Sequence, residues 1–268
     1  MKKYIVFFAF VAAVLVFKIF SVETFEINRD KRTYMSIYSA VLYNAYNILN
    51  IDSDKFPDWG TIGKPYGIGN YCGAGGPFFD TKERESSQYT DVTTKTGGGA
   101  KRIKELYNEL TECRKEGYMD VSQRIHFAKT AAYLGHYIIN INLPYYVAGG
   151  TPLEEKRGIF NVKDWQEPFP AEHKEFVELI KGQGKQYPEF KNIQDFDPWP
   201  GNIEEYIWFC GDRAKKLGIA ADFEEYRKTG DENILRSIIM KADTAFENAS
   251  RAVRTVWMQA YRRNRNTE

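Results

Sequence analysis

The chain has 268 residues, of which 43% are apolar and 15% aromatic, so it can bury a substantial core. Its 37 basic and 36 acidic side chains leave a formal net charge of +1. This balance excludes a strong whole-chain attraction to polyanions, and we expect no nucleic-acid partner.

The first segment is a short apolar run that follows two lysines. Lys2 and Lys3 precede apolar residues from 4 to 17, and Lys18 ends the run. A membrane-spanning helix needs about 20 apolar residues, whereas the core of a secretory signal is shorter. We therefore predict that residues 1–21 are an export signal and that the protein is periplasmic or secreted. One alternative is an uncleaved anchor in residues 1–20, which would make the protein a membrane-tethered structural protein. The other is a buried core helix.

Most of the remaining chain has apolar residues at helical spacing. The pattern predicts helices over residues 34–50, 100–116, 120–139, 170–182 and 203–217, and a long last helix whose apolar face runs from Leu235 to Ala260. Asp120 and Gln123 have the spacing of a capping box at the start of the third of these helices.

Strand-like alternation is nearly absent, so the predicted fold class is all-α, with a single helical domain over residues 22–268. Residues 56–99 contain many glycines and no convincing helix. A connection of this length usually lines a site or is disordered. The three cysteines allow at most one intramolecular disulfide bond.

The stretch "YLGHYIININLPYY", residues 133–146, resembles the signature His-Tyr-x-x-Asp-x-x-x-Pro-x-His of the zinc-dependent phospholipase C family, which is more distantly related to the S1/P1 nucleases. His136, Tyr137 and Pro144 match this signature. The stretch "KFPDWG" looks like the Tyr-Pro-Asp-Tyr segment of the same family, which places Asp58 at a metal-ligand position. The resemblance covers about residues 30 to 260 and implies a multi-helix phospholipase C/P1 nuclease-like bundle with one long glycine-rich loop.

The chain departs from the family at most of the ligand positions. Asn140 stands at the aspartate, Tyr146 at the second histidine, and Asn70 at the histidine that follows Asp58. An asparagine carbonyl is a weak neutral zinc donor, and a tyrosine hydroxyl with a pKa of about 10 is not a ready ligand at neutral pH. The resemblance therefore leaves only Asp58 and His136 as candidate metal ligands.

The two other histidines do not restore the site. His126 matches no ligand position of the family, and His173 lies beside Pro170 and Lys174, which stand at a histidine and a glutamate position. Members of the family bring three zinc ions together, so that a metal-bound water attacks phosphorus. Without most of these ligands, the trinuclear site is not expected to form.

These departures predict a non-catalytic binding or scaffold protein, and we expect no cofactor. Its polar cleft would be lined by the substituted positions and their neighbours, which are Asp58, Asn70, His136, Asn140, Tyr146 and His173. The alternative is a metal-dependent phosphodiester hydrolase that acts on phospholipid head groups, with zinc bound by Asp58 and His136 and assisted by His173 or Asp80. A third interpretation is structural, with His136 as a packed core residue and Asp58 as a turn cap.

Two further motifs suggest contacts outside this cleft. The stretch "YGIGNYCGAGG", residues 66–76, resembles the calcium loop of secreted phospholipases A2, but no histidine follows it before residue 126. Residues 251–265 carry Arg251, Arg254, Arg262, Arg263 and Arg265 without an acid. These cations either complement a helix C-terminus or contact anionic phospholipid, and a phospholipid or membrane surface is the expected partner.

Overall fold

The computed structural model describes eleven parts of the chain, which are residues 38–49, 56–57, 59–60, 67–72, 90–113, 120–147, 151–157, 160–166, 175–176, 178–180 and 195–265. Helices dominate these parts, which confirms the predicted mainly helical class. The predicted export signal lies outside the described residues. None of the described helices is long and apolar enough to cross a membrane.

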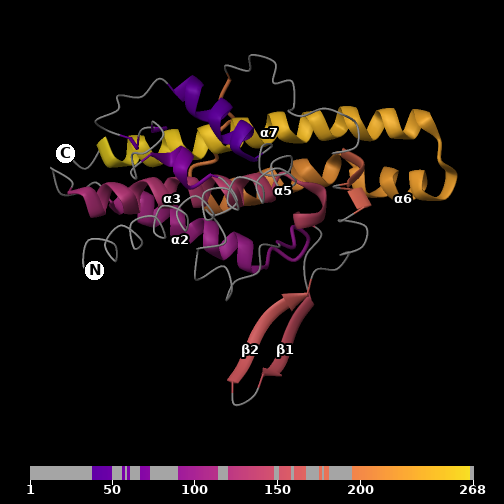
Figure 1. The fold of residues 1–268 in the computed structure, drawn as a ribbon, viewed down its shortest axis with the longest axis horizontal. Coiled ribbons are helices and arrows are strands. Elements are labelled where there is room, and N and C mark those ends of the chain that lie inside the picture. Colours follow the sequence, from indigo (N-terminus) through magenta and orange to yellow (C-terminus); the bar gives the residue numbers. More distant parts are fainter. Residues whose placement is uncertain are drawn as a thin grey trace, which may run out of the picture.

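The chain forms the following elements in order: a helix over residues 38–49, η1 (Ile68–Asn70), α2 (Gly98–Glu112), α3 (Val121–Asn140), η3 (Pro144–Val147), β1 (Thr151–Arg157), β2 (Phe160–Gln166), α5 (Ile203–Lys216), α6 (Ile219–Thr229) and α7 (Glu232–Arg265). Figure 1 shows α7 running along the length of the molecule, with α3 and α2 beside one half of it and α6 beside the other.

The predicted apolar face of α7 forms a large part of the core. Its eight members are all buried, namely Leu235, Ile238, Ala242, Ala245, Ala249, Val253, Val256 and Ala260. Trp257 on the same helix is also fully buried, and its indole Nε1–H donates a 3.1 Å hydrogen bond to the carbonyl of Ala131 on α3. Burial of these residues against α2, α3 and α6 provides the hydrophobic stabilisation of the bundle.

The helix over residues 38–49 packs closely on α3 and α7. Gly135 makes this approach possible, because a Cβ atom at this position would overlap the side chain of Leu42 and lie 3.1 Å from the ring of Trp257. Ser250 on α7 donates a 2.7 Å hydrogen bond to the side-chain oxygen of Asn44. The first described helix is therefore joined to the bundle by both apolar and polar contacts.

Local signals explain where several helices begin and end. The predicted capping box is confirmed, because the Asp120 carboxylate accepts from the backbone N–H of Gln123 and the Gln123 side chain accepts from that of Asp120, both at 2.8 Å. Gly218 and Gly230 adopt left-handed conformations with φ of 68° and 65°, and they separate α5 from α6 and α6 from α7.

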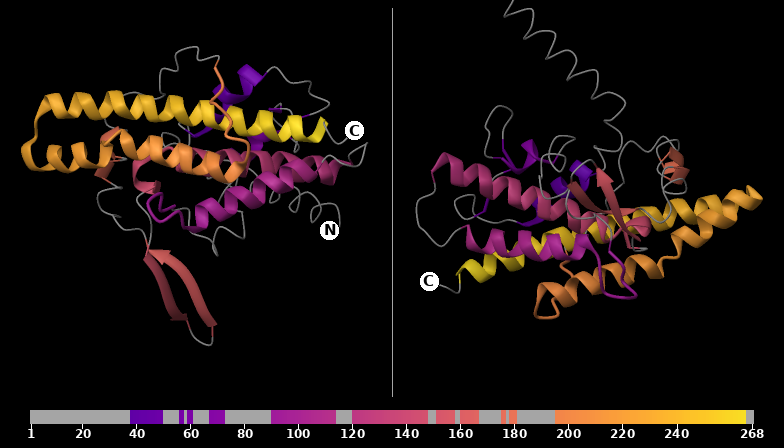
Figure 2. Two further views of the ribbon diagram at one scale, coloured as in Figure 1. Left: turned by 180° about the vertical axis from the view of Figure 1, so that it is seen from behind. Right: turned by 90° about the horizontal axis from the view of Figure 1, so that it is seen from below.

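One hairpin departs from the helical pattern. Strands β1 and β2 pair antiparallel, in a register that runs from Thr151 opposite Gln166 to Arg157 opposite Phe160. The hairpin extends away from the helices in the front and back views (Figure 1 and the left panel of Figure 2). The sequence pattern did not predict it, because this segment carries charged residues without a regular polar and apolar alternation.

Candidate functional site

His136, the principal candidate ligand, lies on α3 and packs against aromatic rings. Its imidazole stacks on Tyr38 with a centroid distance of 4.7 Å and an interplanar angle of 27°. The ring of Tyr137 meets it edge-on at 5.9 Å. Burial lowers the pKa of His136 from 6.5 to about 3, so the imidazole is neutral at physiological pH.

Asn140, one turn further along α3, also contacts Tyr38. Its side chain is fully buried, and its Oδ1 accepts a 2.6 Å hydrogen bond from the hydroxyl of Tyr38. Tyr38 thus joins the two positions by stacking on one and donating to the other. We refer to Tyr38, His136 and Asn140 as the Tyr38 cluster.

The other predicted cleft residues have different surroundings. Tyr146 is buried in η3, where its backbone carbonyl accepts a 2.8 Å hydrogen bond from the N–H of Thr90. Asn70 is exposed at the end of η1. Asp58 and His173 lie outside the described residues. The structure therefore brings His136 and Asn140 together and places Asn70 at the surface.

The described donors fit a zinc ion poorly. Within the part of the chain that the structure describes, no three His, Cys, Asp or Glu side chains are grouped closely enough to hold a metal ion. The Tyr38 cluster offers one imidazole and one amide oxygen that already accepts a hydrogen bond. Zinc sites instead use imidazole, thiolate and carboxylate ligands in tetrahedral sets.

The glycine-rich turn that resembles a calcium loop uses two of its carbonyl groups internally. The carbonyl of Gly67 accepts from the N–H of Asn70, and that of Ile68 accepts from the N–H of Tyr71 and from the Cys72 thiol.

The three cysteines are free thiols, so the disulfide that the composition allows is not formed.

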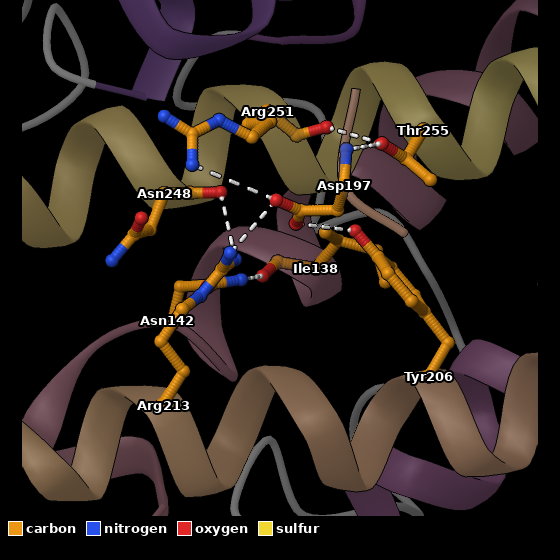
Figure 3. Close-up of polar contacts among 8 residues, drawn as sticks. All are labelled: Ile138, Asn142, Asp197, Tyr206, Arg213, Asn248, Arg251 and Thr255. Carbon is orange, nitrogen blue, oxygen red and sulfur yellow. Dashed lines mark hydrogen bonds and ion pairs between the residues drawn. The ribbon is translucent and has the colours of Figure 1, made fainter. Parts of the chain in front are cut away.

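A second polar cluster, which the sequence did not predict, joins α5, α7 and the extended segment 195–200 (Figure 3). Its centre is Asp197, whose carboxylate accepts from Arg213 Nη1 and from the hydroxyl of Tyr206, both at 2.8 Å. Arg251 Nη1 lies 3.8 Å from the same carboxylate. We refer to Asp197, Tyr206, Arg213 and Arg251 as the Asp197 cluster.

The Asp197 cluster is also connected to the end of α3. Arg213 Nη2 donates to the side-chain oxygen of Asn142 at 3.0 Å and to the carbonyl of Asn248 at 3.2 Å. The amide of Asn142 in turn donates to the carbonyl of Ile138. Burial opposes the charge of Arg213, but the hydrogen bond to Asp197 and the charges of the neighbouring groups together outweigh it and raise the pKa of the guanidinium.

The structure divides the predicted basic C-terminal surface into two parts. Arg254 is fully buried with its guanidinium 5.5 Å from the ring centre of Phe196, and Arg251 is half-buried. Arg262 and Arg263 are exposed in the last turns of α7, where cations complement the helix dipole. Among the arginines whose side chains the structure describes, Arg262 and Arg263 are therefore exposed as the sequence interpretation expected.

Neither a protein-family model nor a curated protein sequence matches this chain.

Proposed function

We propose that this is an exported, non-catalytic binding or scaffold protein with a phospholipase C/P1 nuclease-like fold. In this proposal neutral contacts replace the metal ligands of the family. The observation that carries it is the Tyr38 cluster, in which Asn140 stands at the aspartate position and its Oδ1 accepts the Tyr38 hydroxyl at 2.6 Å.

The chemistry of these contacts supports a packed cluster rather than a metal site. An amide oxygen has no charge to offset that of a cation, and here a metal would compete with a buried hydrogen bond. The ring of His136 gains a stacking contact from Tyr38, and such aromatic pairs contribute about 0.5–1.5 kcal/mol beyond burial. Each position is therefore stabilised without a metal.

Metal content tests the proposal directly. We expect less than one zinc per chain after incubation with zinc and dialysis, and no change in His136→Ala compared with His126→Ala, in which the exposed histidine of the same helix is replaced. The double change Asn140→Asp and Tyr146→His should raise zinc affinity, because it restores two ligand types of the family. Failure of this double variant to bind zinc more tightly would count against the alignment.

The alternative, a phosphodiester hydrolase that acts on phospholipid head groups, is supported by one feature. His136 is neutral at physiological pH, which is the form of imidazole that binds metals. Two or three zinc ions per chain, together with hydrolysis of a chromogenic phosphocholine ester that His136→Ala abolishes and His126→Ala preserves, would replace our proposal with this one.

Export is tested separately by mass spectrometry of the protein recovered outside the cytoplasm. A mature chain that begins near residue 22 would support a cleaved signal. An intact N-terminus in a membrane fraction would instead support tethering through residues 1–20.

A further inference from the structure

We draw no further inference here: the strongest candidate, the start of α2, where residues 98–100 are buried without a side-chain cap and the buried hydroxyl of Thr90 has no hydrogen-bond partner, is a helix N-terminus, and nothing in the described part of the chain directs that hydroxyl to it or shows a ligand there.

Discussion

Replacement of Asp197 should strongly destabilise the protein. The Asp197 side chain is 2% exposed and accepts from Arg213 and Tyr206 at 2.8 Å, while the Arg213 side chain is 19% exposed. Asp197→Ala leaves this guanidinium without its counter-charge. Loss of one partner of a buried ion pair costs about 3–5 kcal/mol, and we expect a decrease of this size in the free energy of unfolding. Asp197→Asn keeps an acceptor and should cost about 1.5–3 kcal/mol.

Urea unfolding followed by far-UV circular dichroism measures these losses. Asp195→Ala is the matched control, because Asp195 lies in the same extended segment but is exposed. We expect this control to change stability by no more than about 0.5 kcal/mol. A similar slope of free energy against urea in all variants would show that the comparison is between equivalent unfolding transitions.

A double-mutant cycle with Arg213→Ala tests whether the ion pair is the cause. If it is, the double variant should be more stable than the sum of the single losses predicts, by about 1–3 kcal/mol. Additive losses would show that the two residues act independently. A loss below about 1 kcal/mol for Asp197→Ala, the value typical of exposed pairs, would refute the reasoning.

Three further predictions follow from the packing of α3. Burial lowers the pKa of His136 to about 3, so below pH 6.5 this histidine takes up a proton in the unfolded state but not in the folded state. The free energy of unfolding should therefore decrease by up to about 1.4 kcal/mol per pH unit as the pH falls. Urea unfolding at several pH values should show that His136→Gln removes this pH dependence and that His126→Gln does not. An ordinary pKa for His136 in an NMR titration would contradict the prediction. Gly135→Ala should lower the free energy of unfolding by about 1–3 kcal/mol through overpacking, whereas a gain in thermal stability would contradict the close approach. Tyr38→Phe should cost about 1 kcal/mol in urea unfolding by removing the hydrogen bond to Asn140, and unchanged stability would show that this bond contributes nothing.

The helices could be predicted because their signals are local. The period of the apolar residues in α7 and the capping box at Asp120 each depend on residues a few positions apart, and the structure confirms both. The short helix α6 was missed, because only Ile219 and Phe223 are buried along it and they give a weak period.

The polar clusters could not be predicted, because their partners are far apart in the chain. Tyr38 and Asn140 are separated by 102 positions, and Arg213 and Asn142 by 71. The sequence drew attention to the stretch 136–146, but nothing local distinguishes an asparagine that replaces a ligand from one that binds another helix. Asp197, in the motif "DFDPWP", has no signal of its own until the helices bring Arg213 and Tyr206 to it.

The arrangement of α6 and α7 predicts which part of the molecule unfolds locally. The first part of α7 lies beside α6, which buries only two residues, while its later part packs in the core through Val253, Val256 and Trp257. Amide hydrogen exchange should therefore slow progressively along this one helix from its N-terminus to its core segment. A single continuous helix would then contain both weakly and strongly protected amides, so that α6 and the start of α7 could separate and reclose while the core remains folded.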